Sequence, residues 1–159
     1  MFRASEVINF AIAIEKNGHK FYQTMAEASI DEKVKQVFRR LAREEQQHIL
    51  DFTHLADKVS GYDPPESYPG EYEDYMEALV NSHVFPQEVD PESLAKAISS
   101  DKEALDLAIR FEKDSILFFE GLKNLVSHTE VKYIDELLRQ ERRHLCELYS
   151  FYMKNFERG

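Results

Sequence analysis

Two Glu-x-x-His motifs occur in this chain, one formed by Glu45 and His48 and the other by Glu141 and His144. Residues three apart on an α-helix lie on the same face, so each pair can direct a carboxylate oxygen and an imidazole nitrogen toward one metal ion. Chance supplies about one such motif in a chain of this composition, so a single copy is weak evidence. Two copies indicate a site for two metal ions.

A lone glutamate precedes each motif at nearly the same interval. Glu15 lies 30 residues before Glu45, and Glu112 lies 29 residues before Glu141. A carboxylate has two oxygens, so glutamates at these places can bridge a pair of ions. The candidate metal ligands are therefore Glu15, Glu45, His48, Glu112, Glu141 and His144.

The residues around these candidates repeat as well. An offset of 97 aligns Ala11-Ile12-x-x-Glu15-Lys16 with Ala108-Ile109-x-x-Glu112-Lys113. An offset of 96 aligns Leu41-x-Arg43-x-Glu45-x-x-His48 with Leu137-x-Arg139-x-Glu141-x-x-His144. Internal similarity of this kind predicts two copies of one helical hairpin.

Four long stretches have the apolar periodicity of helices. They lie at roughly 4–28, 31–59, 102–127 and 130–156. Each has about 25 residues, or about 38 Å at 1.5 Å per residue. Short links join the first two and the last two, with Asp31 and Thr129 predicted as helix-capping residues. Links this short force the joined helices to run antiparallel.

A longer segment, about 61–101, connects the two hairpins and contains all five prolines of the chain. Short helices are expected within it at 71–81 and 91–99, the second capped by Asp90 with Pro91 in its first turn. We interpret the segment as a crossover connection and not as a domain boundary. The predicted fold is an all-α, antiparallel four-helix bundle made of two hairpins.

The candidate ligands fall within the apolar faces of all four predicted helices. In the second helix this face reads Val34, Phe38, Leu41, Glu45, His48, Phe52 and Leu55. Withdrawing an unpaired carboxylate from water costs several kcal/mol, and no lysine or arginine shares these faces. Four such carboxylates would exceed the roughly 5–15 kcal/mol by which a domain is stable, so a bound cation must compensate them.

Composition narrows the functions to consider. The chain fits one domain, residues 1–159, and its net charge of −10 argues against nucleic acid or an anionic membrane as a partner. No segment approaches eighteen uncharged apolar residues, and the N-terminus lacks a signal-peptide pattern, so a soluble cytoplasmic protein is expected. The single cysteine, Cys146, excludes an intrachain disulfide and a cysteine-ligated redox centre.

Several further residues have both a chemical and a structural interpretation. The hydroxyl of Tyr22 could bond a ligand carboxylate or take part in redox chemistry, whereas its ring could simply fill the core. His19 is interpreted as a histidine at the edge of the core. Arg43 and Arg139 are expected to form ion pairs on the exterior, and Cys146 is expected to be a small buried apolar residue.

Two other acidic residues compete with the chosen ligands. Glu44 can share a helix face with the histidine of the first motif, but its counterpart in the repeat is Gln140, so Glu45 is preferred. Asp51 and His54 also have ligand spacing, but they point away from the apolar face and are interpreted as a surface pair.

The ligand set, the Phe21-Tyr22 pair and the position of the crossover resemble the rubrerythrin branch of the ferritin-like di-iron carboxylate proteins. The resemblance covers nearly the whole chain and implies a ferritin-like bundle that holds two iron ions. The roles it implies are terminal ligands for Glu15 and Glu112, bridging ligands for Glu45 and Glu141, and one imidazole per iron from His48 and His144.

Two departures from the family pattern bear on activity. Rubrerythrins usually end in a rubredoxin-like domain with four iron-binding cysteines, whereas only Cys146 is present here. Electrons are therefore expected from a separate donor protein such as a rubredoxin. Many rubrerythrins also have a further glutamate one turn after the third-helix ligand, and here Ser115 occupies that place.

Carboxylate and imidazole ligands suit iron or manganese, with zinc as a further candidate. The leading hypothesis is a di-iron oxidoreductase that reduces hydrogen peroxide or dioxygen while Fe(II) is oxidised to Fe(III). Two alternatives stay open: an iron-binding protein for storage or delivery, and a bundle with a structural di-metal site. Bundles of this class commonly form homodimers, so a dimer is expected.

Overall fold

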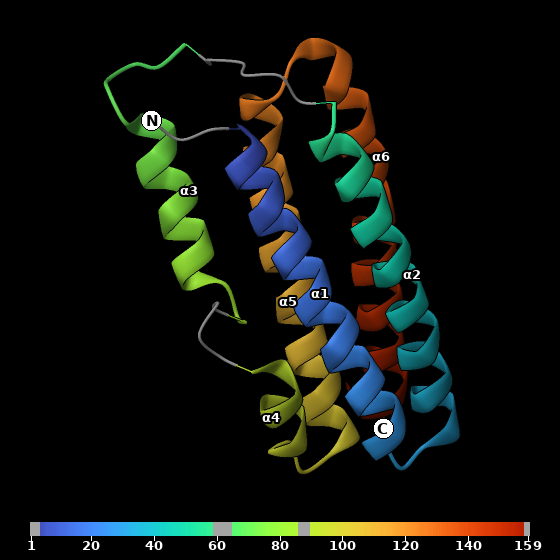
Figure 1. Ribbon diagram of the computed structural model, residues 1–159. Coiled ribbons are helices and arrows are strands. Elements are labelled where there is room, and N and C mark those ends of the chain that lie inside the picture. The colour runs from blue at the N-terminus through green and yellow to red at the C-terminus, as the bar shows by residue number, and fades with distance from the viewer. Residues whose placement is uncertain (1–3, 59–64, 86–89, 158–159) are drawn as a thin grey trace.

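The computed structural model describes residues 4–58, 65–85 and 90–157. Long helices run side by side along the molecule (Figure 1). They are α1 (Ala4–Ala28), α2 (Glu32–Ala56), α5 (Asp101–Leu122) and α6 (His128–Tyr152). The described residues include no strand, and their four long helices confirm the predicted all-α four-helix bundle. Among these residues, no helix is long and apolar enough to cross a lipid bilayer.

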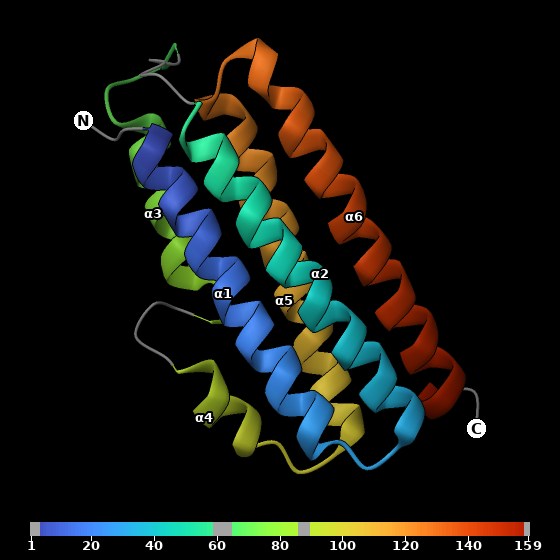
Figure 2. The ribbon, with the colours of Figure 1, turned by 45° about the vertical axis from the view of Figure 1, so that its right-hand side comes forward.

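The long helices form two antiparallel hairpins, α1 with α2 and α5 with α6 (Figure 2). Asp31 caps α2 as predicted, because its carboxylate accepts hydrogen bonds from the amides of Lys33 at 2.7 Å and Val34 at 3.3 Å. Asp101, the first residue of α5, accepts from the amides of Ile30 at 3.1 Å and Asp31 at 2.9 Å. This carboxylate therefore ties the turn of the first hairpin to the start of the second.

The start of α6 differs from the prediction. Ser127 is the N-cap, and the Glu130 carboxylate accepts from the Ser127 amide at 3.0 Å and from its hydroxyl at 2.7 Å. Thr129 lies inside the first turn, so its prediction as the cap was wrong. The glutamate three residues after Ser127 completes a capping box, whereas the residue three after Thr129 is Lys132, which cannot accept a hydrogen bond.

The crossover contains the two predicted short helices, α3 (Glu71–Ser82) and α4 (Pro91–Lys96). Asp90 caps α4 as predicted and accepts from the Ser93 amide at 3.1 Å, but the helix ends earlier than expected. α3 packs on α5 and α4 packs on α1, so the chain returns from the end of α2 to the opposite end of the bundle (Figure 1). The predicted crossover residues 61–64 and 86–89, and the predicted end of the second long helix at residue 59, lie outside the described residues.

An aromatic cluster fixes the crossover to the bundle core. The Phe85 ring, just after α3, lies 5.1 Å from the Phe21 ring of α1 and 5.3 Å from the Phe111 ring of α5, between centroids. Tyr22 stacks on Phe38 of α2 with a centroid distance of 5.8 Å. Such contacts bury large apolar rings in favourable tilted or offset geometries, so the helices that carry the candidate ligands are held together close to them.

Candidate metal centre

All six candidate ligands lie in the middle of the bundle, and all are 0% exposed. Glu15 comes from α1 and Glu112 from α5, while α2 and α6 each contribute one Glu-x-x-His pair. The amphipathic pattern of each helix requires this placement, because the ligands interrupt faces that are otherwise apolar and point inward. Helix periodicity was therefore sufficient to bring the six side chains together.

The side chains form two overlapping groups that could each hold a metal ion. The first group is Glu15, Glu45, His48 and Glu141, and the second is Glu45, Glu112, Glu141 and His144. Within each group, one ligand atom per residue lies within 4.8 Å of the others. Glu45 and Glu141 belong to both groups, which is the geometry that a bridging ligand requires. Their bridging role, like the ligand role of all six, stays a prediction.

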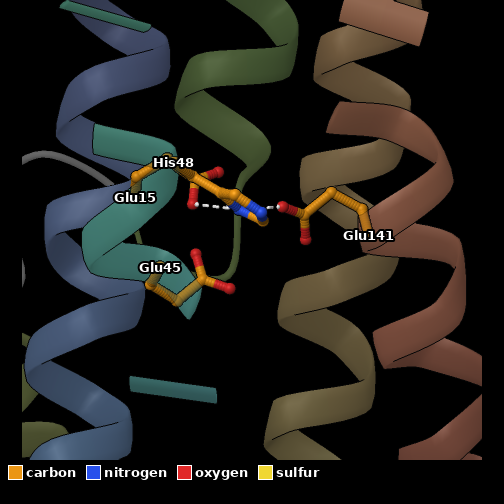
Figure 3. Close-up of side chains that lie close together, drawn as sticks. All are labelled: Glu15, Glu45, His48 and Glu141. Atoms are coloured by element: carbon orange, nitrogen blue, oxygen red, sulfur yellow. Dashed lines mark hydrogen bonds and ion pairs between the residues drawn. The ribbon is translucent and has the colours of Figure 1, made fainter. Parts of the chain in front are cut away.

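Each histidine directs its Nδ1 atom toward the carboxylates, and Figure 3 shows this for His48. His48 Nδ1 lies 3.3 Å from Glu15 Oε2 and 2.7 Å from Glu141 Oε1, which reaches in from α6. His144 Nδ1 lies 3.5 Å from Glu141 Oε2 and 3.7 Å from Glu112 Oε1. The two imidazole rings face each other nearly in parallel, at 19° and 5.6 Å between centroids.

The donor set fits a pair of cations. Several buried ligand atoms have no hydrogen-bond partner, and they include Glu15 Oε1, both carboxylate oxygens of Glu45, Glu112 Oε2, Glu141 Oε2 and His144 Nδ1. Buried polar atoms are normally paired, since an unpaired one costs about 1–3 kcal/mol and a charged one more. Carboxylate oxygens and imidazole nitrogens that converge on one space are the ligand atoms that a divalent first-row metal binds.

The metal-free site holds protons that a cation would displace. Burial raises the pKa of Glu15, Glu45 and Glu112 well above the usual carboxyl value, and neighbouring carboxylates add to the rise. Glu141 behaves differently: burial opposes its ionisation, but the adjacent imidazoles of His144 and His48 prevail and lower its pKa. The charge at the site is thus divided between neutral and ionised carboxyl groups.

The histidines respond to the same carboxylates. Burial by itself lowers the pKa of His48, but the hydrogen bond and charge of Glu141 outweigh burial and raise the pKa to about 9. The pKa of His144 is also raised, because the surrounding carboxylates of Glu112, Glu141 and Glu44 outweigh its burial. Metal binding requires the neutral ring, so each imidazole must give up a proton when a cation enters.

Tyr22 both bonds a candidate ligand and fills the core, the two interpretations that its position in the sequence allowed. Its hydroxyl donates a hydrogen bond of 2.5 Å to Glu112 Oε1, and its ring packs within the aromatic cluster. Burial, followed by the charges of Glu112 and Glu45, raises the pKa of the Tyr22 phenol well above its usual value. The phenol therefore keeps its proton and orients one oxygen of a candidate ligand. A redox role for Tyr22 stays a prediction.

Glu44 and Gln140 lie just outside the six ligands. Glu44 Oε2 contacts His144 Nε2, and Gln140 Oε1 lies 2.9 Å from His48 Nε2. Both contacts cross from α2 to α6. The preference for Glu45 over Glu44 agrees with the two ligand groups, because both groups contain Glu45 and neither contains Glu44. These contacts of Glu44 and Gln140 with the histidines were not predicted from the sequence, although each of the two residues immediately precedes a motif glutamate and they occupy matched positions in the repeat.

The remaining predicted side chains lie at the periphery. His54 is exposed and Asp51 half-buried, and Arg139 pairs with Glu136 at 2.7 Å on the exterior. Arg43 is exposed. His19 lies at the edge of the core, where its Nδ1 is 2.6 Å from the Ala42 carbonyl oxygen.

Cys146 was expected to be buried, and this prediction was wrong. The side chain is exposed and lines an open hollow with Arg40, Glu44 and Arg143. Two residues correspond to about 200° around a helix, so a residue two positions after the inward-facing His144 lies on the opposite side of α6. The apolar character of a thiol did not override this geometry.

Two other residues near the site had no assigned role in the sequence. Gly18, one turn after Glu15, leaves room for the Phe111 ring: a methyl group added there would lie 2.7 Å from Phe111 Cε1 and 3.3 Å from Glu45 Oε2. His83, at the end of α3, is buried and lies 3.4 Å from the Ser115 hydroxyl through its Nε2 atom. Spacing alone could not identify either residue, because both contacts depend on how distant elements pack.

Comparisons with known proteins agree with this geometry. The chain is similar in structure to a Thermotoga maritima protein described as a ferritin-like diiron-carboxylate protein, with a TM-score of 0.69 and 26% sequence identity. The alignment covers 98% of this chain and 97% of that one. No curated protein matches the sequence. The rubrerythrin family model matches residues 6–152. The chain, with its four-helix bundle and its buried carboxylate and histidine cluster, therefore belongs to the rubrerythrin family.

Proposed function

We propose that this protein is a di-iron oxidoreductase that reduces hydrogen peroxide or dioxygen. One observation supports this most strongly: two groups of four buried ligands share Glu45 and Glu141, so two ions held there would be close neighbours. Four carboxylates and two imidazoles suit Fe(II), and manganese or zinc would accept the same atoms. Membership of the rubrerythrin family favours iron among these metals.

A pair of ferrous ions would supply two electrons, which together with two protons convert one hydrogen peroxide into two water molecules. The side chains would hold the ions in place and exclude bulk water. Glu15 and His48 complete one group, and Glu112 and His144 complete the other. Because all six ligands are 0% exposed, charge at the ions is stabilised by fixed side chains and not by solvent.

Tyr22 contributes to this arrangement through its proton. The phenol donates to Glu112 Oε1 and so holds that carboxylate in a single orientation. Returning the oxidised iron to Fe(II) requires an external reductant, and we propose a separate electron-donor protein such as a rubredoxin. The chain has a single cysteine, which is exposed and could not form a thiolate-ligated iron centre by itself.

Rapid mixing of the anaerobic, Fe(II)-loaded protein with hydrogen peroxide or dioxygen tests the proposal. The expected result is a ferric absorbance that forms faster than with free Fe(II), together with consumption of the oxidant. Glu45→Gln should slow the reaction to the rate of free Fe(II), because both groups lose a shared ligand. The double variant Asp51→Asn/His54→Gln is the matched control, since this pair has the same spacing but lies at the surface, and it should react like the wild type.

Oxidation no faster than that of free Fe(II) would contradict the proposal. Sustained oxidant consumption should require an added reductant, with turnover of many equivalents per chain. A large assembly that accumulates hundreds of irons would point instead to storage. Zinc that resists exchange, with no oxidant consumption after iron loading, would point to a structural di-metal site.

A further inference from the structure

Each histidine of the site has a second ring nitrogen that points away from the carboxylates. His144 Nε2 contacts Glu44 Oε2, and His48 Nε2 lies 2.9 Å from Gln140 Oε1. Each contact joins a histidine of one hairpin to a residue of the other, across α2 and α6. The two imidazoles are therefore held from outside by residues that are not candidate metal ligands.

The hydrogen bonds on this outer side determine which nitrogen of each ring carries a proton. Gln140 Nε2 donates to Glu136 Oε1 at 3.4 Å, which turns Gln140 Oε1 toward His48 as an acceptor. An ionised carboxylate can only accept, so Glu44 also requires a donor from His144. Both Nε2 atoms therefore carry the proton when the rings are neutral, and both Nδ1 lone pairs face the site.

Glu44 and Gln140 are counterparts in the duplicated hairpin. The offset of 96 residues that relates the two Glu-x-x-His motifs also relates these positions, and each immediately precedes a motif glutamate. The structure places them on equivalent nitrogens of equivalent rings. They differ in one respect: the acceptor on His144 is a carboxylate, and the acceptor on His48 is a neutral amide.

This difference changes how strongly each ring can bind a cation. A hydrogen bond to a carboxylate is roughly twice as strong as one to a neutral acceptor and draws the ring proton outward, which raises the basicity of the opposite nitrogen. Arg40 and Arg143 line the same hollow as Glu44, so cationic neighbours favour its ionised form. The Glu44 side chain is 31% exposed, so solvent screens part of this effect without removing it.

We propose that the two metal positions are unequal, with the position formed around Glu112 and His144 binding a divalent cation more tightly than the position formed around Glu15 and His48. Glu44 and Gln140 are the positioning residues that set this order. The inference rests on the proposed di-metal function. It adds the order in which the two metal positions fill, which the six ligands alone do not determine. Changes to outer partners of metal ligands commonly alter affinity by about 10- to 100-fold, so two distinct binding steps are expected.

Titration of the metal-free protein with Zn(II), in competition with a chelator, tests this order. The wild type should show two steps whose dissociation constants differ by about tenfold or more. Glu44→Gln should raise the dissociation constant of the tighter step toward that of the weaker step. Gln140→Glu should lower the dissociation constant of the weaker step. The exchanged variant Glu44→Gln/Gln140→Glu keeps the overall composition and should restore two unequal steps.

Which ring binds first provides a second readout. In NMR spectra of ¹⁵N-histidine-labelled protein, with His48 and His144 assigned from His48→Gln, the first equivalent of Zn(II) should shift the Nδ1 signal of His144. In the exchanged variant it should shift that of His48. Circular dichroism of each variant confirms that the helices are retained.

Equal binding steps in the wild type would overturn the inference and leave the proposed function intact. Unequal steps with an order that the exchange does not reverse would also overturn it. Absence of Zn(II) binding in a folded wild type would overturn both this inference and the proposed di-metal function.

Discussion

Tyr22 shows how a single residue can serve the core and the site together. Its ring stacks on Phe38 at 5.8 Å, and its hydroxyl donates to Glu112 at 2.5 Å. The stacking contributes to stability, while the hydrogen bond restricts the orientation of the Glu112 carboxylate, whose other oxygen has no hydrogen-bond partner. These two contributions can be separated by removing the hydroxyl alone.

Tyr22→Phe should weaken binding of divalent metal by about tenfold while the protein stays folded, because the ring remains and the orienting donor is lost. Zn(II) competition titrations measure the change. Tyr149→Phe is a suitable control, since Tyr149 lies exposed on α6 whereas the six candidate ligands are buried. Unchanged affinity in Tyr22→Phe would show that the hydrogen bond does not position Glu112.

His83 forms a hydrogen-bonded link between the crossover and α5. Its Nδ1 accepts from the Phe85 amide at 3.2 Å, and its Nε2 lies 3.4 Å from the Ser115 hydroxyl, which itself donates to the Phe111 carbonyl at 2.8 Å. The ring must therefore be neutral with its proton on Nε2. Burial lowers the pKa of His83 to about 4, so protonation opposes the folded state.

This lowered pKa predicts a loss of stability in mild acid. Between pH 6.5 and about 4 the unfolded chain binds a proton at His83 and the folded chain does not, so the stabilising contribution is complete above pH 6.5 and is lost as the pH falls. The slope from one such group is at most about 1.4 kcal/mol per pH unit. Urea unfolding at pH 7 and pH 5 measures it.

His83→Gln is the control for this prediction, because an amide retains hydrogen-bonding capacity and does not titrate. The variant should lose less stability than the wild type between pH 7 and pH 5. An equal loss in both proteins would assign the acid sensitivity to other groups. NMR titration of the wild-type His83 ring should give a pKa near 4.

At the scale of helices, Gly18 sets how closely α1 approaches the Phe111 ring of α5. A methyl group at this position would lie 2.7 Å from Phe111 Cε1, well inside van der Waals contact. The Phe111 ring is 0% exposed and packs against Tyr22, Phe85 and His83, so it has little room to move. Glycine is needed here for close packing and not for an unusual backbone angle.

Gly18→Ala should destabilise the protein by about 1–2 kcal/mol. Overpacking costs roughly 1–3 kcal/mol, and the gain of up to about 1 kcal/mol in helix propensity offsets part of it. Gly121→Ala on α5 is the matched control: its methyl group would meet the Met76 sulfur at 3.0 Å and Tyr75 Cε1 at 3.2 Å, and the flexible methionine and the exposed tyrosine can both move aside. Denaturant unfolding of both variants checks the prediction, and a stabilised Gly18→Ala would contradict it.

The helices also show which features could be predicted from the sequence alone. Apolar periodicity predicted the four long helices and the inward direction of the six ligands, because both follow from the 3.6-residue repeat. The cap at Thr129 was wrong because two neighbouring residues, Ser127 and Thr129, could both begin a helix, and only the partner at Glu130 distinguishes them. The contacts of Gly18 and His83 depend on packing between segments distant in sequence, and local patterns do not specify it.

For the whole molecule, the duplicated hairpin explains why the site has two nearly equivalent halves. Each hairpin provides one lone glutamate and one Glu-x-x-His pair, and the crossover lets the second hairpin lie against the first (Figure 2). The outer contacts of Glu44 and Gln140 cross between hairpins, so they depend on the relative rotation of α2 and α6. The repeat predicted matched positions, but it could not predict that they meet the opposite histidines.

The concentration of charge in the bundle core has a cost for the whole protein. Four carboxyl groups and two imidazoles are 0% exposed at one level of a small bundle, and several of their atoms lack partners. Without a cation, this polar cluster weakens a fold whose surroundings are apolar. A pair of divalent ions would convert the same atoms into links between all four long helices.

Anaerobic titration of the metal-free protein with Fe(II) tests the central claim most directly. The account predicts two Fe(II) ions bound per chain, and loss of the paired site in Glu45→Gln/Glu141→Gln, because each group would lose both shared ligands. Asp51→Asn/His54→Gln should still bind two ions. Fewer than two ions in the wild type, or two ions retained with unchanged affinity when Glu45 and Glu141 are replaced, would contradict the account.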